Sequence, residues 1–245
     1  MNPFVVIPAR MASTRLPGKP LAAIGGVPMV VHVLRRALAA GIGPVAVACA
    51  EPEIAEAVER AGGRAVLTDP ALRSGSDRVH AALALLDPAG EHDVVVNLQG
   101  DQPAVPPAHL RAVLLPLADP GVDLATLVAP VASEAEAEAA SVVKAACAFA
   151  EGQVVAPALY FSRTAVPWGA GPLWHHIGLY AWRRAALGRF VALPESPLER
   201  RESLEQLRAL EAGMRVACAR VEQASFGVDT AADLEHARAV LGTPG

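Results

Sequence analysis

The chain alternates short, continuous apolar runs with longer stretches whose apolar positions share one helical face. The apolar runs have strand length and lie at residues 4–7, 45–49, 64–68, 93–98 and 124–131. The helical stretches lie at 29–40, 52–61, 77–86 and 107–117. In the first of these, apolar residues recur at 29, 30, 33, 34, 37 and 38, which is the spacing of one helical face. Apolar strands alternating with amphipathic helices predict a mostly parallel sheet in a doubly wound, Rossmann-like α/β fold.

The alternation changes after residue 131. Neighbouring strands are predicted at 142–150 and 154–161, around a Glu-Gly turn, and a third at 177–182. The rest of the chain predicts helices at 184–192 and 198–212, a strand at 215–221 and a closing helix at 231–241. Thr230 or Asp229 is expected to cap that last helix.

This change of pattern defines the expected domain organisation. We interpret the whole chain, 1–245, as one domain. Residues 1–131 and 215–245 are expected to form its core, and residues 132–214 a small inserted α+β subdomain whose following strand and helix return to the core.

Composition and charge narrow the function classes. The 21 basic and 25 acidic side chains give a formal net charge of −4. The chain therefore lacks the excess of positive charge that would attract nucleic acid or an anionic membrane. No apolar run reaches the ~18 residues that span a bilayer, and the N-terminus lacks the pattern of a signal peptide. The three widely spaced cysteines fit a reduced protein better than a disulfide framework or zinc site. We therefore expect a cytoplasmic protein with no membrane or nucleic-acid partner.

The loop after the first strand carries the clearest chemistry. It contains Arg10, Arg15 and Lys19, and ligands of open α/β sheets bind beyond the carboxyl ends of the strands. Clustered cations beside backbone N–H groups suit a polyphosphate. The loop is not a Walker A motif, because Ser13 stands in place of the first glycine and Pro20 follows the lysine. Phosphate binding is favoured over a merely solvated basic loop.

Three further clusters each allow a structural and a functional interpretation. Asp101, in NLQGDQP directly after a buried strand, either holds Mg²⁺ or serves a turn. Ser74, in SGSDR, either presents a helix N-terminus to a nucleotide or is a plain helix cap. For Asp229, in GVDT, a capping role is favoured when this residue is taken alone.

The motifs PARMASTRLPGKPL, SGSDR, NLQGDQP, ALYFSR followed by PW, HHIGLY, SLEQLR and GVDT occur in this order. Together they resemble the 3-deoxy-manno-octulosonate (Kdo) cytidylyltransferase family, also called the CMP-Kdo synthetases, from residue 4 to about 240. The N-terminal motif is shared with related sugar-acid cytidylyltransferases, whereas YFSR–PW, HxGxY and LEQLR are specific to the Kdo enzymes. The resemblance implies a homodimeric, Mg²⁺-dependent nucleotidyltransferase of lipopolysaccharide biosynthesis that converts CTP and Kdo to CMP-Kdo and pyrophosphate.

The resemblance also implies roles for individual residues. The CTP phosphates would be bound by Arg10, Arg15 and Lys19. The cytidine and its ribose would be contacted by Ser74, Arg78 and Gln99. The Mg²⁺ ligands would be Asp101 and Asp229, and the catalytic set Arg10, Lys19 and Asp101. The inserted subdomain would support dimerisation and bind the sugar acid through Arg163, His176, Tyr180, Glu205 and Gln206. Without the flanking motif, His176 alone is interpreted as a satisfied core histidine.

The chain departs from the family pattern at three places. Gln102 stands where the family usually has Glu, Ser76 stands where it usually has Thr, and the segment 168–175 is short. The first change weakens any metal role next to Asp101, and the short segment bears on access of the substrate.

Three alternatives to Kdo activation stay open. The chain could activate another sugar acid, such as a sialic acid or an amino analogue of Kdo. It could transfer a different nucleotide to a sugar 1-phosphate, or it could be a non-catalytic nucleotide-binding regulator.

Overall fold

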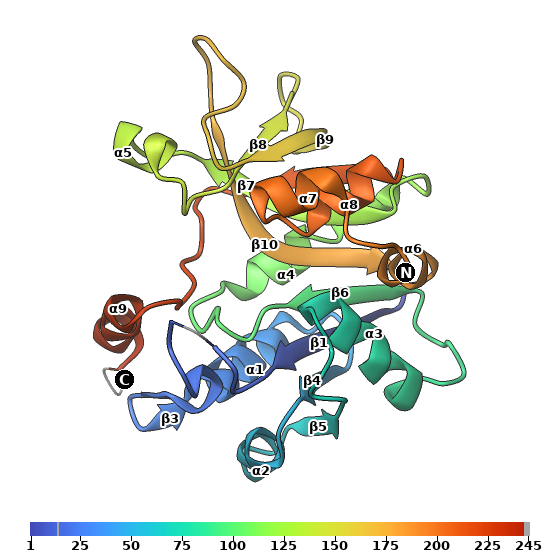
Figure 1. Cartoon of the computed structure of the whole chain (residues 1–245), viewed down its shortest axis with the longest axis vertical. Coiled ribbons are helices and arrows are strands. Elements are labelled where there is room, and N and C mark those ends of the chain that lie inside the picture. Colours follow the sequence, from blue (N-terminus) through green and yellow to red (C-terminus); the bar gives the residue numbers. More distant parts are fainter. Residues whose placement is uncertain (14, 243–245) are drawn as a thin grey trace. The chain divides into compact units, whose positions relative to one another are not determined.

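The structure is a computed structural model that describes residues 1–13 and 15–242 (Figure 1). Thr14, within the predicted phosphate loop, lies outside the described residues. The chain divides into two compact units, one formed by residues 1–110 with the segment from Ser225 onward, the other by residues 111–224. Within the described ranges, no helix has the length and apolar character needed to cross a membrane.

The first unit is built on a parallel sheet. Its strands, in spatial order, are β5 (Arg64–Leu67), β4 (Val45–Cys49), β1 (Pro3–Ala9) and β6 (Val94–Leu98). Every residue of β4 and β6 is buried, as the continuous apolar runs predicted. Parallel strands place their carboxyl ends at one edge, so the loops that follow β1 and β6 emerge together. The predicted Rossmann-like α/β fold is confirmed.

The helices of the first unit are α1 (Met29–Ala40), α2 (Pro52–Arg60), α3 (Gly75–Leu86) and α9 (Ala231–Leu241). The loop after β1 contains the 3-10 helix η1 (Lys19–Leu21) and a small hairpin of β2 (Ala23–Ile24) and β3 (Val27–Pro28). Helix α9 packs on this hairpin (Figure 1), with Leu234 and Ala237 in one apolar cluster with Ile24. The C-terminal helix therefore returns to the first unit, as expected.

The second unit holds a mixed sheet. Its strands, in spatial order, are β10 (Trp174–Arg183), β7 (Leu124–Pro130), β11 (Val216–Arg220), β9 (Val155–Ser162) and β8 (Lys144–Cys147). Only β7 and β11 run parallel, and β8 also pairs with the beginning of β10. The helices of this unit are η2 (Leu115–Ala118), α5 (Glu134–Glu138), α6 (Arg184–Val191), α7 (Pro197–Glu202) and α8 (Gln206–Glu211). Helix α4 (Pro107–Ala112) spans the sequence boundary between the units.

The second unit is larger than the insertion expected from the sequence. It contains all of residues 132–214, together with β7 and β11, which the sequence assigned to the core. The reason lies in the strand pairing, because β7 pairs with β10 and β11 pairs with β9.

The single helix predicted at 198–212 is wrong, because the chain breaks between α7 and α8. Ser203 ends α7 in the left-handed region, with φ of 54°. The Arg163 side chain stabilises this break by donating to the carbonyl oxygens of Glu202 and Ser203 at 2.6 and 3.2 Å. The helical periodicity continues across a non-helical residue, so the pattern gave no signal of the interruption.

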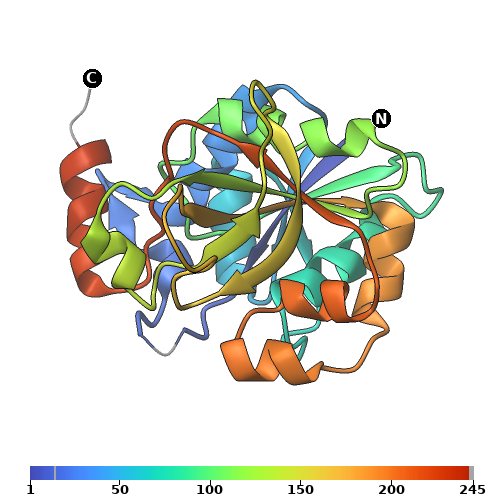
Figure 2. The same cartoon turned by 90° about the horizontal axis from the view of Figure 1, so that it is seen from above.

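A buried ion pair joins α7 to α8, which lie against each other (Figure 2). Arg208 Nε donates to Glu199 Oε2 at 2.8 Å, and its guanidinium lies 4.6 Å from the centroid of the Phe190 ring. Burial opposes the charge of Glu199, but the hydrogen bonds from Arg208 and from the Ser196 backbone hold its pKa below the usual value. This pair fixes the start of α8, where Gln206 lies.

Candidate functional site

One cavity of the first unit collects every residue that the sequence assigned to nucleotide or metal binding. Its volume is about 340 Å³. The predicted residues among its lining are Arg10, Arg15, Lys19, Ser74, Arg78, Gln99, Asp101 and Asp229. They come from the loop after β1, the start of α3, the end of β6 and the segment before α9. Gln102 and Ser76, two of the departures from the family pattern, are buried and do not line this cavity.

The loop after β1 is shaped by its own backbone. Gly18 has a φ of 71°, which a residue with a Cβ rarely adopts, and its N–H donates to the carbonyl of Met11 at 3.2 Å. The N–H of Met11 donates in turn to the Glu51 carboxylate at 2.9 Å. This turn starts η1, so Lys19 is held at the beginning of a short helical turn.

Two backbone constraints place Asp101 beside Asp229. A Cβ at Gly100 would lie 2.9 Å from the carbonyl oxygen of Pro8, so only glycine lets the end of β6 approach β1 this closely. The backbone N–H of Val228 donates to the carbonyl of Asp101 at 2.8 Å. The two carboxylates therefore face the same cavity although 128 positions separate them in sequence.

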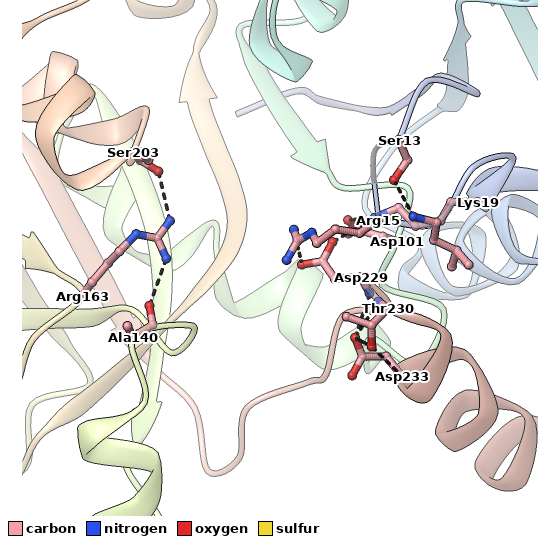
Figure 3. Close-up of polar contacts among 11 residues, drawn as sticks. Ser13, Arg15, Lys19, Asp101, Ala140, Arg163, Ser203, Asp229, Thr230 and Asp233 are labelled. Atoms are coloured by element: carbon pink, nitrogen blue, oxygen red, sulfur yellow. Dashed lines mark hydrogen bonds and ion pairs between the residues drawn. The ribbon is translucent and has the colours of Figure 1, made fainter.

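The capping role favoured for Asp229 is wrong. Thr230 caps α9 instead, because its hydroxyl accepts from the N–H of Asp233 at 3.2 Å while the Asp233 carboxylate accepts from the Thr230 N–H at 2.8 Å (Figure 3). The Asp229 carboxylate is consequently available to the cations of the loop, and Arg15 Nη2 lies 3.1 Å from its Oδ2 (Figure 3).

Lys19 lies between the two carboxylates. Its Nζ is 2.8 Å from Asp101 Oδ2 and 3.1 Å from Asp229 Oδ1, and the side chain is 15% exposed. Burial lowers the pKa of Lys19, but the two carboxylates outweigh burial and the pKa rises above its ordinary value. Lys19 is therefore protonated at neutral pH, and its ammonium group lies between the two carboxylates.

The other side of the cavity offers a buried guanidinium and a helix start. Arg78 is 2% exposed, and its Nη1 donates to the Thr68 hydroxyl at 2.6 Å and to the Asp69 carbonyl at 3.2 Å. Its Nη2 has no hydrogen-bond partner in the described part of the chain, which leaves a donor for a ligand. Ser74 caps α3 in a reciprocal box with Asp77, so the structural interpretation of Ser74 holds, and the residue also lines the cavity.

The predicted sugar-acid residues lie in the second unit, and three of them come together on β10 and α8. The rings of His176 and Tyr180 are 5.7 Å apart, and the Tyr180 hydroxyl donates to Gln206 Oε1 at 3.3 Å. Gln206 Nε2 is buried without a hydrogen-bond partner among the described residues. Burial lowers the pKa of His176 to about 3, so its imidazole is neutral. An unpaired amide donor beside a neutral imidazole and a phenol suits a polar, hydroxylated ligand.

Arg163 and Glu205 lie at the break between α7 and α8. Besides its two contacts at that break, Arg163 donates to the carbonyl of Ala140 at 2.9 Å (Figure 3). Its guanidinium thus binds three backbone carbonyls, and this is a structural role. Glu205 Oε1 lies 4.0 Å from Arg208 Nη2.

Comparison with known proteins identifies the family. The family model for cytidylyltransferases matches residues 4–216. The 3-deoxy-manno-octulosonate cytidylyltransferase of Rhodospirillum centenum is 62% identical over 240 residues, covering 98% of this chain and 93% of its own. The enzyme of the same name from Rhodospirillum rubrum is 62% identical over 241 residues, covering 98% and 96%. The chain belongs to the 3-deoxy-manno-octulosonate cytidylyltransferase family. The resemblance found in the sequence is confirmed.

A solved structure extends the family likeness to three dimensions. The structure of CMP:2-keto-3-deoxy-manno-octonic acid synthetase complexed with CTP is 40% identical, covers 98% of each chain and has a TM-score of 0.89. A nucleotidyl transferase from Methanothermobacter thermautotrophicus, 17% identical with a TM-score of 0.60, shares the fold alone. The chain is thus a nucleotidyltransferase of the cytidylyltransferase family.

Sequence reasoning missed several residues that hold the second unit's polar groups in place. The Glu202 carboxylate accepts from the Arg163 N–H at 3.0 Å and from the Ser162 hydroxyl at 3.2 Å. Lys144 is fully buried and donates to three carbonyl oxygens. Thr126 contacts His176 through its hydroxyl. No motif marks Thr126, since a threonine in an apolar strand is an ordinary strand residue.

Proposed function

We propose that this chain transfers CMP from CTP to the anomeric hydroxyl of Kdo and releases pyrophosphate, for lipopolysaccharide biosynthesis. The observation that carries the proposal is the single cavity in which four cations and two carboxylates from four separated segments converge. The relatives' names supply the acceptor, and the reported CTP complex supplies the nucleotide.

The nucleotide side acts by positioning and charge. A triphosphate placed in this cavity meets Arg10, Arg15 and Lys19, which offset negative charge on the phosphates and on the departing pyrophosphate. The unpartnered Nη2 of Arg78 is a donor for a carbonyl of the base. The sugar hydroxyl oxygen forms a bond to the α-phosphorus and releases its proton to solvent. The bond between the α-phosphorus and the pyrophosphate oxygen breaks, and no covalent enzyme intermediate is required.

The two carboxylates fit a divalent cation. Mg²⁺ is commonly bound by one or two carboxylates together with substrate phosphates, and Asp101 and Asp229 already hold one cation between them. Within residues 1–13 and 15–242, no cluster of three or more His, Cys, Asp or Glu side chains forms a metal site by itself. This agrees with a site that the nucleotide completes. Bound Mg²⁺ would supply charge that neutralises phosphate oxygens and lowers the pKa of a nearby hydroxyl.

The acceptor side is proposed to lie on the second unit, at His176, Tyr180, Gln206, Glu205 and Arg163. Three of the five N–H groups of the Arg163 guanidinium donate to backbone carbonyls, which leaves two N–H groups. These two could donate to the carboxylate of the sugar acid. Gln206 Nε2 is the second donor available there.

We also propose that the protein is a cytoplasmic homodimer. The described cysteines are all free, which suits a reducing compartment where CTP is found. Exposed apolar residues of the second unit, Leu159 at 68% and Trp168 at 99%, offer contact area to a second copy.

The test is an acceptor panel. With CTP and Mg²⁺, we expect pyrophosphate release to depend on added Kdo and to fall by at least about tenfold with a sialic acid or with a sugar 1-phosphate. Equal release with a sialic acid would assign a different acceptor. No release with any acceptor, despite CTP binding, would favour the nucleotide-binding regulator.

A further inference from the structure

Strand β10 contains an irregularity at the centre of the proposed sugar-acid site. Ile177 pairs with Leu127, but the next pair joins Tyr180 to Thr126, so Gly178 and Leu179 interrupt the register. An interruption of this kind leaves backbone carbonyls without their ladder partners.

The hydroxyl of Thr126 satisfies these carbonyls. Its Oγ1 lies 3.1 Å from the carbonyl oxygen of Ile177 and 3.0 Å from that of Leu179. It also lies 3.0 Å from Nε2 of His176, and the Thr126 side chain is completely buried. One hydroxyl therefore connects the irregular segment to the histidine that precedes it.

The Thr126 hydroxyl has a single proton, and this sets the direction of its hydrogen bonds. A carbonyl oxygen only accepts, so the single hydroxyl proton of Thr126 is directed toward the two carbonyls. The contact with His176 must then use a lone pair of the Thr126 oxygen and a proton on Nε2. Because burial keeps the imidazole neutral, the other ring nitrogen, Nδ1, carries a lone pair. In the described part of the chain, Nδ1 of His176 has no hydrogen-bond partner.

We propose that Thr126 is a positioning residue that fixes His176 in its Nε2–H tautomer and thereby makes Nδ1 an acceptor for a hydroxyl group of the substrate. This inference rests on the proposed function, which places the sugar acid at His176. A neutral nitrogen with an unpaired lone pair attracts a hydroxyl donor and repels a carboxylate. His176 therefore binds hydroxyl groups of the sugar acid and leaves its carboxylate to other groups.

The test compares Thr126→Val, which removes the hydroxyl at nearly constant volume, with Thr126→Ser, which keeps it. In the unmodified protein, long-range proton–nitrogen NMR of His176, assigned with His176→Gln, is expected to show a protonated Nε2 and an unprotonated Nδ1. Thr126→Val is expected to lose this fixed tautomer and to raise KM for Kdo about tenfold, with KM for CTP unchanged. Thr126→Ser is expected to retain both properties.

Two results would overturn the role of Thr126. The first is an Nδ1–H tautomer in the unmodified protein. The second is a folded Thr126→Val variant with unchanged tautomer and KM, where folding is judged by thermal unfolding. If the valine variant does not fold, the tautomer of the unmodified protein and of Thr126→Ser decides the question. Absence of turnover with Kdo in the unmodified protein, with the predicted tautomer present, would instead overturn the proposed function.

Discussion

Replacing Asp101 with Asn is expected to lower turnover by roughly 10²–10³-fold, the loss typical of removing one group that stabilises transition-state charge. The Asp101 carboxylate contacts Lys19 and lines the cavity beside Asp229. Asparagine keeps the shape of the side chain but removes the negative charge that pairs with Lys19 and that the proposed Mg²⁺ would require. Steady-state kinetics at saturating CTP and Kdo measure the effect, and circular dichroism checks the fold.

The matched control for this variant is Asp119→Asn. Asp119 also forms an ion pair, 2.7 Å from Arg215, but it lies in the second unit and its side chain is 49% exposed. We expect the activity of Asp119→Asn to stay within about twofold of the unmodified protein. Exposed ion pairs contribute little to stability, and Asp119 does not line the cavity of the first unit. Near-normal turnover of Asp101→Asn would remove the metal and catalytic assignments of Asp101.

Replacing Lys19 with Met is expected to lower turnover by about 10²-fold or more and to raise KM for CTP. The substitution keeps an unbranched side chain and removes the only charge seen between Asp101 and Asp229 in the described structure. The carboxylates then repel each other and the incoming phosphates. Turnover and KM are measured separately, because a lysine that only binds the ground state would change KM alone.

Two further variants serve as controls for Lys19→Met. Lys19→Arg keeps the charge and is expected to recover part of the turnover, although the larger guanidinium does not reproduce the ammonium position. Arg35→Met removes an exposed cation of α1, away from the cavity lining, and is expected to have no effect. Turnover of Lys19→Met equal to that of Arg35→Met would show that the loop cation plays no part in the reaction.

The sequence predicted most elements because their ends coincide with local signals. Helix α1 spans residues 29–40 both in the prediction and in the structure. Its apolar spacing ends at Gly41, which has a φ of 63°. Strand β4 likewise matches residues 45–49. The eight residues that the resemblance implied for nucleotide and metal binding line one cavity. Strand geometry alone accounts for the loops after β1 and β6, because the ends of parallel strands lie at one edge.

Most features that the sequence did not predict depend on long-range contacts. The break at Ser203 depends on Arg163, forty positions earlier. The choice between Asp229 and Thr230 as the helix cap is the exception, because the reciprocal hydrogen bonds between Thr230 and Asp233 decide it locally. The role of Thr126 depends on an irregularity in a strand fifty positions later. The contacts of Arg163 with Ser203 and of Thr126 with β10 cannot be assigned from periodicity or from a local motif.

In the proposed reaction, the sugar hydroxyl itself attacks the α-phosphorus of CTP. The most direct test supplies Kdo labelled with ¹⁸O at the anomeric hydroxyl and analyses the products by mass spectrometry. We expect the label to be retained in CMP-Kdo and the pyrophosphate to be unlabelled. Unlabelled CMP-Kdo, or pyrophosphate and CMP formed without any CMP-Kdo, would contradict it.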